Sequence, residues 1–297
     1  MDAILTLGLQ DWSDASGDTG WIAAAEAGQV LYFPRLAFRL SAAEQALLRP
    51  GLLAEGVRNI SLDGEGRLKG VAGGKPVEGS VLPLVSRFAV QARDLVRRLF
   101  PAYDAHLIAA PTSLRPVQVS TRKQSVRADD RRLHVDAFPS RPNRGERILR
   151  VFSNVNPHGE PRVWRIGEPF EDVARRYLPR ARAYSGRQAA VLHRLGITKS
   201  LRSEYDHLML QLHDRMKADE EYQRNSPQQT MPFPSGSTWV CFSDQTVHAA
   251  MAGQYLLEQT FHLPVAWQYD PNASPLAILT RLMGRPLAGA PLPSFAA

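Results

Sequence analysis

The chain has 297 residues, of which 44% are hydrophobic and 22% are charged, a composition typical of globular proteins that excludes a disordered chain. No run of eighteen apolar residues is present, so the sequence predicts no membrane-spanning helix. The formal net charge is +7, and the single cysteine, Cys241, excludes a disulfide framework and a cysteine-based zinc site.

The first hundred residues predict one strand and two helices. Residues 1–30 are expected to be irregular, except that a strand is predicted over 29–33. A capping box opens a predicted helix over 41–48. After a Gly-rich loop or hairpin at 61–80, apolar residues at helical spacing predict an amphipathic helix over 84–100, with four arginines on its other face.

Short strands dominate the remainder of the chain. Residues 191–217 have a helical pattern, and the polar, proline-rich residues 219–234 predict a loop. Helices followed by many short strands favour an α+β protein with a double-stranded β-helix (jelly-roll) core and flanking helices. The predicted strands cover residues 114–119, 133–138, 148–155, 162–166, 238–242 and 249–257.

The domain organisation is predicted to be simple, because no internal repeat and no long linker is evident. We expect a single domain over 1–297. In it, residues 1–110 form a mainly helical support, residues 111–270 form the jelly-roll core with the helical insertion at 191–217, and residues 271–297 form a tail.

A His-x-Asp pair lies in one of the predicted strands. Alternate residues of a strand point to the same face, so His134 and Asp136 can face one metal ion. Of the other histidines, His248 is the best candidate for a third ligand, because it begins a distant predicted strand. Two imidazoles and a carboxylate form the facial triad of iron(II) oxygenases, which leaves three coordination positions open. A His-x-Asp pair also occurs by chance, so these three residues alone leave the question open.

The positive charge is concentrated in one part of the chain. Residues 113–187 contain 17 Lys and Arg against 8 Asp and Glu, so this segment carries +9 and the remainder −2. Such a segment favours an anionic partner such as nucleic acid, an acidic membrane surface or a charged small molecule, although a solvated arginine-rich surface explains it equally well. No nucleic-acid-binding motif is present, so we expect no nucleic acid partner.

Longer motifs around the His-x-Asp pair are more specific than the pair itself. Together they closely resemble the Kdo (3-deoxy-D-manno-oct-2-ulosonic acid) hydroxylase family of Gram-negative bacteria, over most of the chain from about residue 29 onward. The motifs are HVDAFPSRP at 134–142, GERILRVFSNVNP at 145–157, GEPRVW at 159–164, GEPF at 167–170, FSDQTVHAA at 242–250, YFP at 32–34 and SPL at 274–276.

The resemblance implies a specific enzyme. Members of the family are dioxygenases with a jelly-roll core that require iron(II), 2-oxoglutarate and dioxygen, and ascorbate is expected to stimulate them. They hydroxylate Kdo of lipopolysaccharide at C3, which gives Ko. The implied substrate is Kdo attached to lipid A or its precursor, at the inner face of the cytoplasmic membrane. The expected location is therefore cytoplasmic and peripheral to that membrane.

The co-substrate carboxylate needs a cation. Many jelly-roll oxygenases have an arginine about ten residues after the distal histidine, but residues 249–270 contain no Arg or Lys. Arg150 is the first candidate, because it lies in an apolar strand and a guanidinium can bind a carboxylate through two hydrogen bonds. A structural ion pair, for example with Glu168, is the alternative. Arg162 and Arg115 follow, and Asn154 could hydrogen-bond the co-substrate.

The sugar carboxylate and the phosphates of lipid A also need cations. Arg115, Arg127, Arg141 and Arg144 surround the proposed triad in the sequence, although each one alone could be solvated surface. For contact with an anionic membrane surface, we expect the amphipathic helix at 84–100 and the apolar stretch at 276–285. Packing of both segments against the core is the alternative.

Two other functions are compatible with the residues. One is an oxygenase of the same chemistry that acts on nucleic acid or protein. The other is a non-catalytic jelly-roll protein that binds a sugar or a metal.

Overall fold

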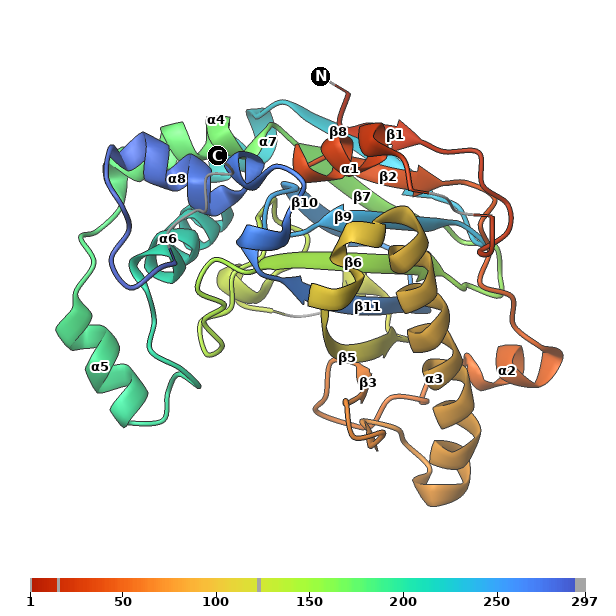
Figure 1. Ribbon diagram of the computed structural model, residues 1–297. Helices are drawn as coiled ribbons and strands as arrows, with labels where there is room; N and C mark the ends of the chain where they lie inside the picture. Colours follow the sequence, from red (N-terminus) through yellow and green to blue (C-terminus); the bar gives the residue numbers. More distant parts are fainter. Residues whose placement is uncertain (1, 15–16, 122–123, 292–297) are drawn as a thin grey trace.

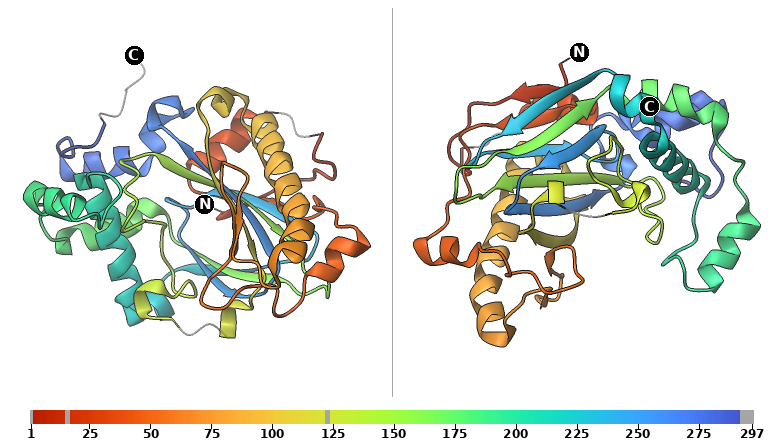
Figure 2. Two further views of the ribbon diagram at one scale, coloured as in Figure 1. Left: turned by 90° about the horizontal axis from the view of Figure 1, so that it is seen from below. Right: turned by 180° about the vertical axis from the view of Figure 1, so that it is seen from behind.

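Two facing β-sheets form the centre of the molecule in the computed structural model, which describes residues 2–14, 17–121 and 124–291. The larger sheet lies against helix α3, and further helices gather at one end of the two sheets (Figures 1 and 2). The last six residues of the tail predicted over 271–297 lie outside the described residues.

The larger sheet has the strand order β1-β2-β9-β6-β11-β5-β3-β4. β1 and β2 pair in parallel, and the other neighbours are antiparallel. The strands are β1 (Ile4–Thr6), β2 (Val30–Phe33), β3 (Ile60–Leu62), β4 (Leu68–Lys69), β5 (Ile108–Arg115), β6 (Arg147–Asn154), β9 (Thr238–Phe242) and β11 (Leu256–Leu263).

The smaller sheet has the order β10-β7-β8, with β10 (His248–Ala252), β7 (Arg162–Gly167) and β8 (Gln228–Phe233). An isolated antiparallel bridge joins His134 to His248 and extends this sheet by one short pairing beyond β10. The smaller sheet faces the central strands β9 and β6 of the larger one, as aromatic contacts between the two sheets show. This arrangement confirms the predicted jelly-roll core with flanking helices.

Aromatic side chains fill the space between the sheets. Phe233 stacks on Trp239 at a ring distance of 4.1 Å, and Trp164 packs edge-on against Trp239 at 5.5 Å. Phe152 completes the group. Phe242 is also buried, but it belongs to the second core, between the larger sheet and its helices. Both Trp164 and Phe242 are thus core residues.

The outer face of the larger sheet is covered by α3 (Gly74–Leu99), which contacts β11, β5 and β3. α1 (Thr19–Glu26) contacts β2 and β9, and α2 (Ala42–Leu47) begins with the predicted capping box at Ser41. The apolar stripe of α3, which includes Phe88, is buried against the sheet. The packing alternative therefore holds for the apolar stripe of this helix, which is covered by protein and is not available to a membrane.

Between β7 and β8 the chain forms α4 (Phe170–Tyr177), α5 (Gly186–Arg194), α6 (Glu204–Ala218) and α7 (Glu220–Asn225). α8 (Pro275–Met283) packs against α4 and buries residues 275–279. The stretch at 276–285, the second expected membrane contact, is thus also largely a packing surface. No helix in the described part of the chain is both long enough and apolar enough to cross a membrane.

The structure differs from the sequence prediction in several elements. Residues 133–138 form only a bridge, and the strand predicted over 249–257 is two strands, separated where Gly253 and Tyr255 adopt positive φ. The segment 219–234 contains α7 and β8 rather than a loop. Pro232 is tolerated because β8 is an edge strand, where a missing amide hydrogen breaks no ladder.

The N-terminal part also contains more regular structure than predicted. Residues 1–30 include β1 and α1, and α3 begins at Gly74, ten residues before the predicted start. The predicted support at 1–110 also contributes β1 to β4 to the larger sheet, so it is continuous with the core. The division of the chain into a single domain with three parts stays a prediction.

Burial of α3 leads to a stability prediction. We expect Phe88→Ala to lower the free energy of unfolding by about 3–5 kcal/mol, because a fully buried ring leaves a cavity. Val90→Ala is the control, because Val90 lies on the same helix and is 63% exposed, and this change should affect stability little. Urea denaturation of both variants measures the difference. Equal, small effects would mean that the stripe does not pack on the sheet.

Candidate metal centre

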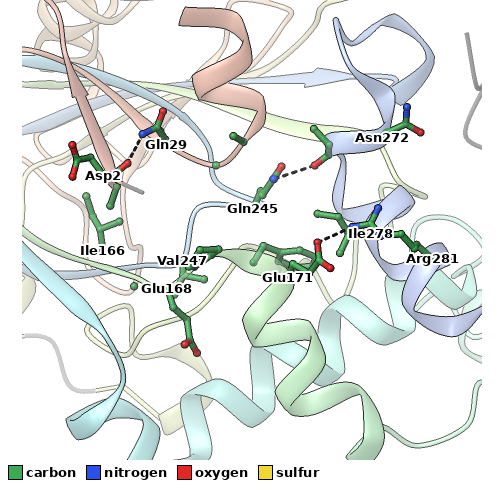
Figure 3. Close-up of a pocket in the computed structure, with 17 residues that line it drawn as sticks. Asp2, Gln29, Ile166, Glu168, Glu171, Gln245, Val247, Asn272, Ile278 and Arg281 are labelled. Carbon is green, nitrogen blue, oxygen red and sulfur yellow. Dashed lines mark hydrogen bonds and ion pairs between the residues drawn. The ribbon is translucent and has the colours of Figure 1, made fainter. Parts of the chain in front are cut away.

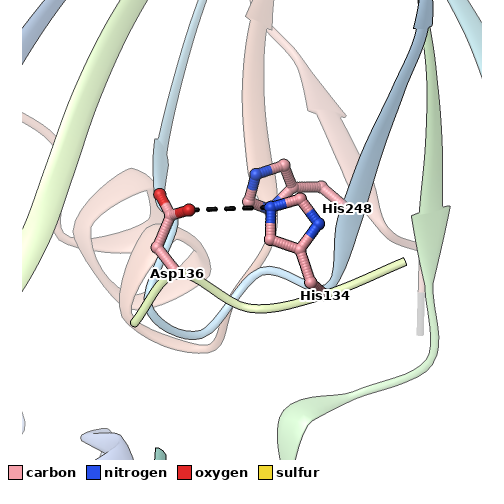
Figure 4. A group of neighbouring side chains, drawn as sticks. All are labelled: His134, Asp136 and His248. Carbon is pink, nitrogen blue, oxygen red and sulfur yellow. Dashed lines mark ion pairs between the residues drawn. The ribbon is translucent and has the colours of Figure 1, made fainter. Parts of the chain in front are cut away.

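Main-chain hydrogen bonds bring together three side chains that are far apart in the sequence. His134 and His248 exchange backbone hydrogen bonds of 3.0 and 2.9 Å, and the amide of Asp136 donates to the carbonyl of Ser243 at 2.8 Å. One potential ligand atom from each of the three side chains lies within 4.8 Å of the others. Figure 4 shows the two rings and the carboxylate converging on one space. The predicted cluster is therefore assembled in the structure.

Both imidazoles are oriented by their second ring nitrogen. Nδ1 of His134 lies 2.7 Å from the carbonyl of Arg132, and Nδ1 of His248 lies 2.8 Å from the carbonyl of Thr246. A carbonyl only accepts, so each Nδ1 carries the proton and each Nε2 keeps a free lone pair. Burial also holds the pKa of both rings below its usual range, which favours the neutral, ligating form.

The carboxylate of Asp136 is held in its charged form. Burial alone would raise the pKa of this carboxyl, but the guanidinium of Arg150 and the two histidine rings hold it well below its usual range. Nη2 of Arg150 lies 2.8 Å from Oδ2 of Asp136, whereas Oδ1 lies 3.7 Å from Nε2 of His134. One carboxylate oxygen is thus paired, and the other faces the histidine rings.

This donor set fits a divalent metal ion. Two neutral imidazoles and one ionised carboxylate on one side of a cavity form the facial arrangement of non-haem iron(II) sites. A structural zinc site would usually close the coordination with a fourth protein ligand. Among the described residues, the three side chains are the only group of His, Cys, Asp or Glu with this geometry.

Arg150 is the centre of a buried chain of charges. Its Nη1 donates to Oε1 of Glu258 at 2.8 Å, and Oε2 of Glu258 lies 2.8 Å from Nε of Arg115. The ion pair predicted as the alternative for Arg150 therefore exists, but with Asp136 and Glu258 rather than with Glu168. Glu258 lies ten residues after His248, which is the position at which many jelly-roll oxygenases have an arginine. Burial would raise the pKa of Glu258, but Arg115 and Arg150 hold it below its usual range.

Two other predicted co-substrate ligands lie farther along their strands. Asn154 is four residues from Arg150 on β6, and its amide donates to the carbonyls of Glu160 and Phe233. Arg162 is four residues before Ile166, the partner of His248, and its Nη1 donates to the carbonyl of Gly253. Four residues of a strand correspond to about 13 Å. These hydrogen bonds of the two side chains go to main-chain carbonyls, and the role of both residues toward the co-substrate stays a prediction.

The arginines predicted for substrate binding divide into two groups. Arg115 belongs to the buried chain of charges. Arg141 and Arg144 are exposed on the loop between Asp136 and β6, and Arg127 is exposed and pairs with Asp214 of α6. Their roles toward substrate stay predictions.

Helix α6 contributes two residues that the sequence prediction missed. The ring of His213 lies 5.5 Å from the ring of His134, and its side chain is only 12% exposed. Lys217 is buried, and its Nζ donates to the carbonyl of Arg127. Their i, i+4 spacing places them on one helix face, but only the position of α6 shows that this face meets the cluster.

A buried ion pair supports the turn that leads into His248. Nε of Arg147 donates to Oδ2 of Asp244 at 2.7 Å, and Oδ1 of Asp244 accepts from the amide of Ile148 at 3.0 Å. Both side chains of the pair are fully buried. The turn at 243–246 is therefore fixed to the start of β6, and the position of His248 follows from it.

The other side of this turn lines a separate cavity of about 310 Å³. Gln245 and Val247 point toward it, together with Ile278 and Arg281 of α8 (Figure 3). None of the three cluster residues lines this cavity. It is therefore distinct from the metal centre.

The geometry predicts the effect of removing each ligand. Loss of a residue that only hydrogen-bonds to a metal ligand typically lowers metal affinity by roughly 10–100-fold. We expect His134→Ala, Asp136→Ala and His248→Ala each to reduce cobalt(II) affinity by more than this. His158→Ala, at an exposed turn, is the control. Titration followed by the visible absorption of bound cobalt measures the affinity. A ligand variant with unchanged affinity would remove that residue from the coordination set.

Comparisons with known proteins agree with this site. The family model described as 3-deoxy-D-manno-oct-2-ulosonic acid (Kdo) hydroxylase matches residues 9–286. A search of curated proteins found no match. Three solved structures of the Kdo hydroxylase KdoO, a non-haem Fe(II) alpha-ketoglutarate-dependent dioxygenase, are each 44% identical, with both chains fully covered. The TM-score is 0.93 for the cobalt(II) complex, and 0.92 both for the complex with alpha-ketoglutarate and Fe(III) and for that with succinate and Fe(III). The chain belongs to the Kdo hydroxylase family.

Proposed function

We propose that the protein is an iron(II)- and 2-oxoglutarate-dependent dioxygenase that hydroxylates Kdo. The observation that carries the proposal is the convergence of His134, Asp136 and His248 in a fold that matches KdoO over its full length. The same match supports iron, 2-oxoglutarate and dioxygen as the requirements of the reaction. It favours Kdo over the nucleic acid and protein substrates that the sequence left open, and an enzyme over a binding protein.

Iron, when bound, supplies the activation of dioxygen, which is coupled to oxidative decarboxylation of 2-oxoglutarate. The protein contributes geometry. His134, Asp136 and His248 would hold the metal from one side, which would leave three positions for co-substrate and dioxygen. Arg150 keeps Asp136 ionised and oriented, and the buried surroundings limit the access of water.

We infer that Arg115 rather than Arg150 binds the distal carboxylate of 2-oxoglutarate. Both Nη atoms of Arg150 already contact carboxylates, so Arg150 is not available for a second bidentate pair. Arg115 contacts Glu258 through Nε only, and its side chain is 23% exposed, so its Nη groups remain available within the described structure. Glu258 then positions both guanidinium groups.

The charges support this assignment. The buried chain contains two carboxylates and two guanidinium groups, so it is neutral before ligands bind. Iron(II) and the 2-oxoglutarate dianion carry opposite charges of equal size, so binding both of them leaves the site neutral. Burial of ions is tolerated when they are paired in this way.

For the substrate, we propose oxygen insertion at C3 of a Kdo unit attached to lipid A or its precursor, which gives Ko. The family match supports a Kdo-containing substrate. The exposed arginines near the cluster in the sequence, Arg127, Arg141 and Arg144, are suited to the carboxylate of the sugar and the phosphates of lipid A. A substrate of this kind would place the enzyme at the cytoplasmic face of the inner membrane.

The function is tested by product analysis. We expect mass spectrometry of Kdo-lipid A incubated with the enzyme, iron(II), 2-oxoglutarate and ascorbate to show the gain of one oxygen atom, which fragmentation locates at C3. Asp136→Ala is the matched negative control. An unmodified lipid together with normal iron binding would exclude this substrate.

The two arginines can be separated by two affinities. Arg115→Ala should weaken 2-oxoglutarate binding about 10–100-fold, because a charge-assisted pair of roughly 1.5–3 kcal/mol is lost, and should leave cobalt(II) affinity unchanged. Arg150→Ala should instead weaken metal binding, by about 10–100-fold, because Asp136 loses its partner. Metal titration and co-substrate titration of both variants give the comparison. The reverse pattern would make Arg150 the co-substrate anchor.

A further inference from the structure

We propose that residues 178–203, which contain α5 and are called here the α5 arm, dock the enzyme onto an anionic phospholipid bilayer. This inference rests on the proposed function, because a bilayer is where a Kdo-bearing lipid would be presented. α5 lies apart from the sheets, beyond α4, α6 and α8, and extended segments join it to its neighbours (Figures 1 and 2).

The arm exposes large aliphatic side chains. Val191 is 56% exposed, Leu195 67%, Ile197 53% and Leu201 48%. Val191 and Leu195 lie one turn apart on the same side of α5. Single exposed apolar residues are normal, but four within residues 191–201 are concentrated in one short segment, as is typical of an interaction surface. By contrast, the stripes of α3 and α8 are buried.

The charge of the arm is entirely positive. Residues 178–203 contain no Asp or Glu and six cations, which are Arg180, Arg182, Arg187, Arg194, Lys199 and Arg202. None of the six forms an ion pair with a described residue. Unpaired cations beside exposed aliphatic side chains complement a bilayer, since its surface is anionic and its interior apolar. A nucleic acid surface is also anionic, but it offers no apolar interior in which the aliphatic side chains could be buried.

The arm is hydrogen-bonded to the loop that follows the metal-centre residue Asp136. The amide of Lys199 donates to the carbonyl of Ser140 at 2.9 Å, and Nη2 of Arg202 donates to the carbonyl of Pro139 at 2.7 Å. Both acceptors lie on the loop that follows Asp136. The arm also leads into α6, and nine residues of helix, about 14 Å, separate Glu204 from His213 beside His134. Docking of the arm would therefore bring the metal centre within reach of a sugar at the bilayer surface.

The test is co-sedimentation of the full-length protein with phosphatidylcholine vesicles that contain or lack phosphatidylglycerol, at low and high salt. The wild type should bind only the anionic vesicles, and less at high salt. Arg187→Gln/Arg194→Gln should weaken binding by about five-fold for each cation. Leu195→Ser/Ile197→Ser should weaken it about tenfold, because apolar burial is lost. Val90→Ser and Arg93→Gln, exposed on α3, are the matched controls.

A parallel assay separates this inference from the proposed function. Turnover of a water-soluble Kdo saccharide should be the same in the wild type and the arm variants, whereas turnover of vesicle-bound Kdo-lipid should fall in the arm variants alone. Vesicle binding that is unaffected by the arm variants, or absent in the wild type, would overturn the docking surface. The docking surface would also be overturned if the arm variants lost binding to an RNA or DNA oligonucleotide while their vesicle binding was unchanged. Absence of turnover on both substrates would instead reject the proposed function.

Discussion

The site depends on a chain of alternating charges that is buried between the sheets. Asp136, Arg150, Glu258 and Arg115 come from four different segments, and each is paired with the next. A single buried charge would be very costly, whereas a paired and neutral chain is tolerated. The chain keeps the metal-facing carboxylate ionised and holds β6, β11 and β5 in register around the centre. Removal of any member would leave its neighbours uncompensated.

A second constraint acts on the backbone. The backbone bridge between His134 and His248 holds these two segments side by side. The buried ion pair of Arg147 and Asp244 fixes the turn that precedes His248. Each imidazole is then oriented by a main-chain carbonyl. The coordinating groups are thus set by backbone geometry, which is stiffer than contact between side chains and suits a site that must stay open on one side.

The amphipathic segments show how pattern and context differ. α3 and α8 have apolar stripes that lie on the core, whereas α5 carries aliphatic side chains that reach solvent beside unpaired cations. In the sequence all three are helical segments with apolar and basic residues. Packing partners alone distinguish a core-facing stripe from a free one, since the hydrophobic effect depends on which area is removed from water.

The sequence by itself determined the fold class from its local periodicity, and it predicted the metal ligands and the family through the motifs at residues 134–170 and 242–250, because these depend on residue identities. It predicted β2, β6, β7 and β9, whose apolar runs are strong. It missed β8, where Pro232 hides an edge strand, and the break at Gly253. The tertiary structure alone decided the partners of Arg150, the proximity of Glu258 and Arg115, and the approach of His213. These contacts join residues whose separation in sequence carries no information about distance, because they depend on how the strands pair and how the sheets pack.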